Sequence, residues 1–272
     1  DPFFSELLAG IGNKAAEHEF DLLVSTRAPG HEELDAYERI VRERRVDGLL
    51  VVRTRHRDPR IAYLLDQEFP FVAFGRSDLA GKKVDFSYLD VNGHAGMYQV
   101  TQHLINLGHR RIGYISAPLD LWFASHRLAG YQEALAQNDI PFDEHLFTIG
   151  ELTEQSGYLA AQRLLVHTPY PTAIITCNDL MAFGAISAAE EQGLAVGRDI
   201  AITGFDDVPL AEHARPPLTT VHQPIYEIGQ RICDLLIQQL LGEIAMPQHI
   251  ILEPRLVIRQ SCGAYHTLNQ GK

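Results

Sequence analysis

The sequence has 272 residues and a hydrophobic content of 46%, which is enough for a large core and predicts one large or two medium domains. The formal net charge of -12 argues against nucleic-acid binding by this chain alone, because phosphate contacts require clustered Lys and Arg side chains. No apolar run approaches the roughly 18 residues of a membrane span, and the first residues lack a signal-peptide pattern, so we expect a cytoplasmic protein that does not bind membranes.

The first third of the chain alternates between helical and strand-like patterns. It opens on a helix that Asp1-Pro2 would cap, with an apolar stripe made of Phe4, Leu7, Leu8, Ile11 and Ala15. This alternation implies a parallel sheet with right-handed crossovers. Strands are predicted at residues 21–26, 46–52 and 71–74, and further helices at 32–45 and 59–68.

The rest of the chain repeats this alternation, which implies a second parallel sheet. Pro216-Pro217 and Pro224 bracket an extended segment that leads into a long amphipathic helix at residues 225–241. Residues 250–258, interrupted by Pro254, are typical of two short strands. The other predicted strands are 112–115, 146–149, 173–176 and 200–205, and the other helices are 92–107, 154–167 and 179–192.

Residues 107–131 combine a helix end, a buried strand, an aromatic loop and a new helix. Gly108 ends the first helix, and Pro118 follows the strand. Trp122 and Phe123 are predicted on the loop, with Arg127 beginning the next helix. Loops at the carboxyl ends of parallel strands hold ligands in α/β proteins, so this loop is a candidate ligand site.

Several motifs of enzymes and metalloproteins are weak or missing. Residues 10–15 superficially fit a dinucleotide fingerprint, but they lie within a helical stripe with no preceding strand. The 13 histidines show no metal-binding spacing, and no nucleophile elbow or phosphate loop occurs. Cys177, Cys233 and Cys262 are widely spaced and are expected to be reduced thiols. We therefore predict no cofactor, no metal and no catalytic activity.

Polar side chains follow three of the predicted strands. For Asp179 and Asp207 the favoured role is helix N-capping, which Asp performs routinely at such positions. Asn178 and Asp206 are the better candidates for ligand contacts, because loops of an open α/β sheet converge on one crevice. Their amide and carboxylate groups can each hold vicinal hydroxyls. Gly75-Arg76 occupies the corresponding position after residues 71–74.

The roles of Arg127 and Trp122 remain open at this level. Arg127 could pair with a surface carboxylate such as Glu133, or it could direct its planar donors at a ligand. Trp122 could fill the core, or it could stack on the C–H face of a sugar. Phe3, Phe4 and Phe123 could complete an apolar wall around such a ligand.

Taken together, and in this order, ten short segments resemble the effector-binding core of the lactose/galactose repressor (LacI/GalR) family of bacterial transcription regulators. The resemblance covers nearly the whole chain but includes neither the family's N-terminal helix-turn-helix nor an apolar first strand before Asp1. The segments are Asp1-Pro2-Phe3-Phe4, Val46-Asp47-Gly48, Asp90 with Gly93, Leu107-Gly108-His109-Arg110-Arg111-Ile112, Arg127-Leu128-Ala129-Gly130-Tyr131, Pro171-Thr172-Ala173, Asn178-Asp179, Gly204-Phe205-Asp206-Asp207, Pro217-Leu218-Thr219-Thr220-Val221 and Arg255-Leu256-Val257-Ile258-Arg259-Gln260-Ser261.

The resemblance implies a periplasmic-binding-protein-like α/β fold, in which two doubly wound parallel-sheet lobes are joined by three crossover segments and hold an effector in the cleft. The crossings are expected near residues 90–92, 221–224 and 250–254. One lobe would comprise residues 1–91 and 223–250, the other 92–222 and 251–265, with a tail at 266–272. The implied ligand contacts are Phe3, Phe4, Gly75 or Arg76, Trp122, Phe123, Arg127, Asn178, Asp206 and Gln223.

The function implied is that of a sensing and dimerisation domain of a regulator, expected to be a repressor, whose lobes rearrange with effector and change operator affinity. Operator DNA would be bound only through a helix-turn-helix that this chain lacks. One Arg, one Asp and an aromatic stacker favour a neutral mono- or disaccharide as effector. The alternatives are a periplasmic sugar-binding protein of a transport system, which shares the fold, and an enzyme on the same fold.

Overall fold

The structure is a computed structural model that describes residues 1–27, 30–78 and 85–264. Its chain forms two compact units. Unit 1 comprises Asp1–Val91, Leu121–Phe123 and Pro224–Leu252, and unit 2 comprises Asn92–Asp120, Ala124–Gln223 and the chain from Glu253 onward. By this division the chain passes between the units after Val91, Asp120, Phe123, Gln223 and Leu252. The expected tail at 266–272 lies outside the described residues.

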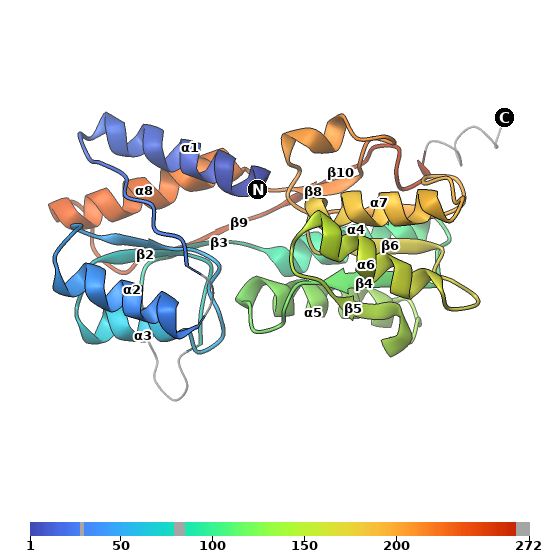
Figure 1. Cartoon of the computed structure of the whole chain (residues 1–272), viewed down its shortest axis with the longest axis horizontal. Helices are drawn as coiled ribbons and strands as arrows, with labels where there is room; N and C mark the ends of the chain where they lie inside the picture. Colours follow the sequence, from blue (N-terminus) through green and yellow to red (C-terminus); the bar gives the residue numbers. More distant parts are fainter. Residues whose placement is uncertain (28–29, 79–84, 265–272) are drawn as a thin grey trace. The chain divides into compact units, whose positions relative to one another are not determined.

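Unit 1 contains a four-stranded sheet with the order β1-β2-β3-β9, in which every neighbouring pair is parallel. Helices α1 and α8 cover one face of this sheet, and α2 and α3 cover the other (Figure 1). The elements are α1 (Pro2–Glu17), α2 (His31–Arg42), β1 (Leu49–Val51), α3 (Pro59–Asp66), β2 (Phe71–Phe74), β3 (Tyr88–Val91), α8 (Ile225–Leu241) and β9 (His249–Leu252).

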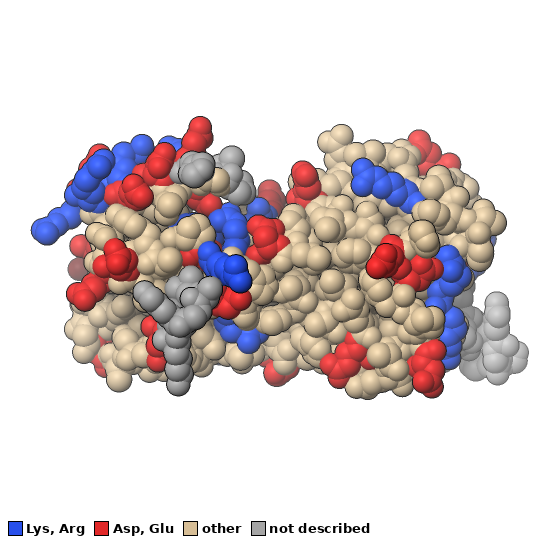
Figure 2. Space-filling view, turned by 90° about the horizontal axis from the view of Figure 1, so that it is seen from below, with Lys and Arg blue, Asp and Glu red and all other residues tan. Residues whose placement is uncertain are grey.

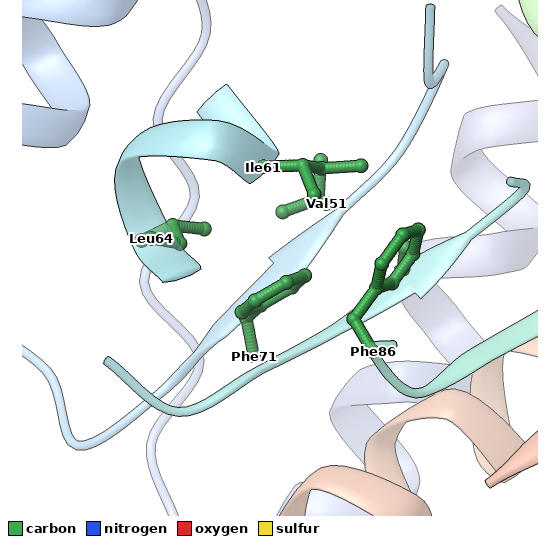
Figure 3. Close-up of a cluster of buried hydrophobic side chains, with 6 residues drawn as sticks. Val51, Ile61, Leu64, Phe71 and Phe86 are labelled. Atoms are coloured by element: carbon green, nitrogen blue, oxygen red, sulfur yellow. The ribbon is translucent and has the colours of Figure 1, made fainter. Parts of the chain in front are cut away.

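A hydrophobic cluster joins helix α3 to the sheet of unit 1 (Figure 3). Ile61 and Leu64 are fully buried on the inner face of α3, where they meet Val51 of β1. Phe71 and Phe86 stack beside them with ring centroids 5.7 Å apart. Burial of each such side chain contributes about 1.5–3 kcal/mol, so this cluster fixes the strand ends from which the neighbouring loops depart.

Helix α1 begins at an N-cap, because the Asp1 carboxylate accepts a hydrogen bond from the Phe3 amide at 3.1 Å. It packs closely on α8. A Cβ atom on Gly10 would lie only 2.1 Å from the Tyr226 carbonyl oxygen, so this crossing requires glycine. Gly10 thus serves the packing of α1 on α8.

Unit 2 contains a parallel sheet with the order β5-β4-β6-β7 and an antiparallel ribbon of β8 and β10. Successive residues of β4 point to opposite faces. Gly113 faces Leu164 of α6, whereas the Tyr114 ring packs against Tyr131 of α5, so helices cover both faces. The elements are α4 (Gly93–Asn106), β4 (Ile112–Ser116), α5 (Trp122–Gln137), η1 (Glu144–Leu146), β5 (Phe147–Ile149), α6 (Glu154–Leu165), β6 (Ala173–Thr176), α7 (Asp179–Glu191), β7 (Ala201–Thr203), η2 (Pro209–Glu212), β8 (Thr220–His222) and β10 (Arg255–Val257).

Two local predictions are wrong, and one strand was not predicted. Residues 21–26 form no strand in the described structure, and Leu22, Leu23 and Val24 are 42%, 51% and 53% exposed, because no neighbouring strand pairs with them. Strand β3 was not predicted, since Asp90 interrupts its apolar run. Helix α5 begins at Trp122 rather than at Arg127, so Trp122 and Phe123 lie in its first turn and not on a loop.

Candidate functional site

The predicted ligand-binding residues fall into two sets, one in each unit. Within each set the structure brings side chains from distant parts of the sequence into contact. The unit 1 set is Phe3, Phe4, Arg76, Trp122 and Phe123, and the unit 2 set is Arg127, Asn178, Asp206 and Gln223.

The first turn of α1 places two aromatic rings beside the end of β2. Phe3 stacks on Phe74 with ring centroids 6.2 Å apart, and it meets Phe4 edge to face at 5.5 Å. The Arg53 guanidinium lies 4.7 Å above the Phe4 ring and also pairs with Asp1 at 3.2 Å. The result is an apolar surface with a cation at its edge.

Trp122, the only tryptophan of the chain, contacts two loops of unit 1. Its backbone amide donates to the Thr54 carbonyl at 2.9 Å, and its ring centroid lies 4.7 Å from that of His56. The Arg76 guanidinium lies 5.5 Å from the same ring, and its Nε donates to Asp90 at 2.7 Å. Sequence reasoning did not identify His56 or Asp90 as neighbours of these side chains, because strand β3, which carries Asp90, was not predicted.

A buried ion-pair network holds the loop that carries His56. Arg60 is 4% exposed and donates to both carboxylate oxygens of the fully buried Asp58. Its terminal nitrogens also reach the carbonyls of Val52 and Arg53 at 3.2 and 3.0 Å. Burial acts to raise the pKa of Asp58, but the hydrogen bond and charge of Arg60 hold it below its usual value. Asp58 is therefore ionised and keeps the loop conformation fixed.

In unit 2, Arg127 is buried on the inner face of α5. Its guanidinium donates to the Cys177 carbonyl, stacks 3.5 Å above the Phe205 ring, and lies 3.8 Å from the Asp206 carboxylate. The alternative partner Glu133 instead pairs with His94 at 2.9 Å. The surface ion pair considered for Arg127 is therefore wrong, and its charge lies beside Asp206.

Asp206 follows β7 on a turn with unusual backbone geometry. Its φ angle is 119°, and that of Asp207 is 59°. The angle of Asp206 is strained for any residue other than glycine and persists only where surrounding contacts enforce it, whereas Asp adopts an angle near 60° more readily. The Asp206 amide donates to the Val221 carbonyl at 2.9 Å, and the Gln223 side chain donates to its carboxylate at 2.6 Å. Two predicted ligand residues, Asp206 and Gln223, thus contact each other directly.

The helix-capping roles differ from those expected. Asn178, favoured as a ligand contact, is the N-cap of α7, with its side-chain oxygen 3.1 Å from the Met181 amide. Asp179, favoured as the cap, is fully buried and instead accepts hydrogen bonds from the Thr220 hydroxyl and the Val208 amide. Burial, and then the nearby charge of Asp206, raises the pKa of Asp179 well above its usual value.

Asp207 is not an N-cap either, since η2 is preceded by Val208. Its carboxylate contacts His222 and Arg259. The unit 2 set thus combines a guanidinium, a carboxylate and two amides, which suits a ligand with several hydroxyl groups. Residues 1–27, 30–78 and 85–264 contain no group of three or more His, Cys, Asp or Glu side chains that could hold a metal ion.

Comparison with known proteins places the chain among bacterial regulators. Residues 101–262 match the periplasmic binding protein-like domain family. The transcriptional regulator CelR of Thermobifida fusca is 35% identical over 263 residues, which is 96% of this chain and 76% of that protein. A regulatory protein of the LacI family from Chloroflexus aggregans superposes with a TM-score of 0.84 at 38% identity, covering 95% of this chain and 92% of its own. This chain belongs to the LacI family of transcriptional regulators.

LacI-family membership confirms the predicted fold and the predicted regulator class. The chain is therefore the ligand-binding part of a transcriptional regulator and not a transport protein. A structure of CelR in complex with cellobiose superposes with a TM-score of 0.87 at 34% identity, covering 96% of this chain and 79% of the CelR chain. Among the described helices of this LacI-family chain, none has the length and apolar character needed to cross a membrane.

Proposed function

We propose that this chain senses a neutral mono- or disaccharide and, as part of a homodimeric cytoplasmic repressor, changes that repressor's affinity for operator DNA. The observation that carries the proposal is the buried contact of Arg127 and Gln223 with the Asp206 carboxylate. We propose no catalytic role. Operator contact would require a DNA-binding segment in addition to this chain, whose net charge is -12.

The charge balance of the two sets favours a neutral ligand. Arg127 lies beside Asp206 in unit 2, and Arg76 pairs with Asp90 in unit 1. A phosphorylated ligand would need cations whose charge is not already balanced by a carboxylate. On the face of unit 1 shown in Figure 2, basic and acidic side chains are likewise interspersed.

Aromatic side chains support a sugar rather than another small polar molecule. Trp122, Phe3 and Phe4 supply flat apolar faces, on which the C–H surface of a pyranose packs well. Cellobiose is the first compound to test, because the structure of CelR that resembles this chain is a complex with cellobiose. We propose that each residue set can contribute contacts to a sugar effector.

A thermal-shift panel tests this proposal, with isothermal titration calorimetry of each compound that raises the melting temperature. The panel contains cellobiose, maltose, glucose, glucose 6-phosphate, adenine and hypoxanthine. We expect a neutral sugar to bind, with Asp206→Ala abolishing the shift and Asp199→Ala, a change at an exposed ion pair of the same unit, preserving it. A response confined to the phosphorylated sugar or the purines would contradict the proposal.

A groove on unit 2 is the surface we propose for homodimer formation. It has a volume of about 220 Å³ and contains the apolar residues Phe183, Ile186 and Leu210, of which Leu210 is 52% exposed. Glu190 and Arg215 border the same groove, so a second copy related by two-fold symmetry can offer complementary charges. Light scattering of Leu210→Asp tests this: the variant should be monomeric, whereas an unchanged dimer would place the interface elsewhere.

A further inference from the structure

Asp207 is held from two sides by basic side chains of unit 2. His222 Nδ1 lies 3.0 Å from one carboxylate oxygen, and Arg259 Nη1 lies 2.8 Å from the other. The Asp207 side chain is 12% exposed and that of Arg259 is 19% exposed. With both oxygens engaged, Asp207 is poorly suited to contact a ligand itself.

The position of Asp207 in the backbone suggests what its contacts with His222 and Arg259 stabilise. Asp207 directly follows Asp206, and both residues have positive φ angles that cost free energy unless neighbouring contacts enforce them. The Asp206 amide donates to the Val221 carbonyl at 2.9 Å, and the Asp206 carbonyl accepts from the Gln223 amide at 3.4 Å, which is a long hydrogen bond. The contacts of Asp207 with His222 and Arg259 secure the other end of the strained turn.

The two partners of Asp207 lie on the β8–β10 ribbon, in the case of His222, or just after it, in the case of Arg259. His222 ends β8, one residue before Gln223, the last residue before the chain passes to unit 1. Arg259 follows β10, the strand that begins soon after the chain returns at Glu253. His222 also pairs with Arg255 in the register of this ribbon. One carboxylate therefore joins the Asp206 turn to both connecting strands.

We infer that Asp207 is a positioning residue, which fixes the Asp206 turn for effector binding and transmits occupancy of that turn to the β8–β10 ribbon. The inference rests on the proposed function, in which Asp206 contacts the effector. A shift of the Asp206 carboxylate on binding would alter the Asp207 ion pairs, and through them the strands that connect the units.

The first experiment needs no ligand. Backbone NMR of isotope-labelled protein reports the positive φ angle of Asp206 through its Cα shift and amide coupling. Asp207→Asn keeps a residue that tolerates a positive φ but removes the charge. We expect the Asp206 signals to move toward ordinary values in Asp207→Asn, and to stay unchanged in Asp199→Asn, which breaks a more exposed Asp–Arg pair elsewhere in unit 2.

The second experiment adds cellobiose and follows the His222 ring resonances, assigned from His222→Gln. In the wild type, cellobiose should shift them, whereas Asp207→Asn should lose this response and bind about tenfold more weakly or worse. Arg259→Gln should act in the same direction and Arg259→Lys should restore binding in part, which provides a test if Asp207→Asn does not fold. Unchanged Asp206 signals together with unchanged affinity in Asp207→Asn would overturn the inference. Failure of the wild type to bind cellobiose or any other sugar would contradict the proposed function instead, since the first experiment stands without it.

Discussion

The fully buried Asp179 carboxylate accepts a hydrogen bond from the Thr220 hydroxyl at 2.6 Å, which ties the start of helix α7 to strand β8. The same carboxylate lies where any side chain on Gly204 would have to go, since a Cβ there would be 2.2 Å from Asp179 Oδ1. This relationship locates the turn that carries Asp206, and it places an acid where ionisation is costly.

The first prediction concerns the pH dependence of stability. Burial raises the pKa of Asp179 above its ordinary value of 3.8, so the folded state binds more protons than the unfolded state above that pH. The free energy of unfolding therefore decreases as the pH rises above 3.8, because the unfolded state releases this proton more readily than the folded state. Asp179→Asn should not show this decrease, because Asn does not titrate. The free energy of unfolding of the variant minus that of the wild type should therefore increase from pH 4.5 to pH 7.5 in urea titrations. A difference that is constant across this range would contradict the raised pKa.

The second prediction concerns strain at Asp206, whose φ angle is 119°. At ordinary sites, Gly is less stable than Ala by about 0.5–1 kcal/mol. At position 206 the order should reverse, because Gly relieves a strain of about 1–3 kcal/mol that Ala retains. Thermal unfolding of Asp206→Gly and Asp206→Ala measures this difference, and both variants should lose effector binding. A less stable Gly variant would show that the turn is relaxed.

The third prediction concerns the burial of charge beside Asp206. Removal of the Arg127 guanidinium in Arg127→Met leaves the Asp206 carboxylate without its cation, at a cost of about 3 kcal/mol. The double variant Arg127→Met, Asp206→Asn should recover part of that loss. Asn carries no charge, so the cost of burying the Asp206 carboxylate without the Arg127 cation is removed. Denaturant titrations of the two single variants and the double variant give the coupling. Strict additivity would mean that the two side chains do not interact.

The fourth prediction compares two glycines of helix α1. A Cβ on Gly10 would lie 2.1 Å from the Tyr226 carbonyl oxygen, whereas a Cβ on Gly12 would meet nothing closer than Leu22 at 3.9 Å. Gly12→Ala should stabilise the protein by up to about 1 kcal/mol, since Ala favours helix. Gly10→Ala should destabilise it by about 1–3 kcal/mol despite the same preference. Equal effects in thermal unfolding would show that α1 and α8 pack less closely.

The fifth prediction uses the single tryptophan. Because Trp122 lies beside His56 and Arg76, an effector that stacks on it should change the fluorescence of the whole chain. Trp122→Phe should lose the signal while calorimetry still detects binding, weakened by about 0.5–1.5 kcal/mol. A control, Tyr98→Phe on an exposed hydrogen bond of α4, should leave both readouts unchanged. An effector that binds without any fluorescence change would argue against stacking on Trp122.

Elements with a strong periodic pattern and clear ends could be predicted from sequence alone. Helix α8 begins after Pro224 and ends at Gly242, whose φ of 70° terminates the helix, and its predicted bounds agree with the structure. Strands β2 and β6 are short apolar runs with the predicted bounds. Where pairing with a distant strand decides the outcome, as at residues 21–26, local pattern is insufficient.

The candidate site likewise has features that local sequence predicts and others that depend on distant contacts. Sequence position identified Asp206 and Asn178 as polar groups at strand ends, but not which of their neighbours they would bind. The contacts of Asp179 with Thr220, and of Asp207 with His222 and Arg259, join segments that lie 15 to 52 residues apart in the chain. Such pairs depend on sheet order and register, which a single sequence does not specify.

The three cysteines bring a practical consequence. Cys177 lies beneath Arg127, and it, Cys233 and Cys262 are only 0%, 5% and 1% exposed. Buried thiols react slowly with maleimide dyes. The native cysteines should therefore react little with such dyes. One cysteine introduced on the surface of each unit can then be labelled, so that one unit carries the donor dye and the other carries the acceptor dye. Energy transfer between the two dyes would then report the separation of the units with and without effector.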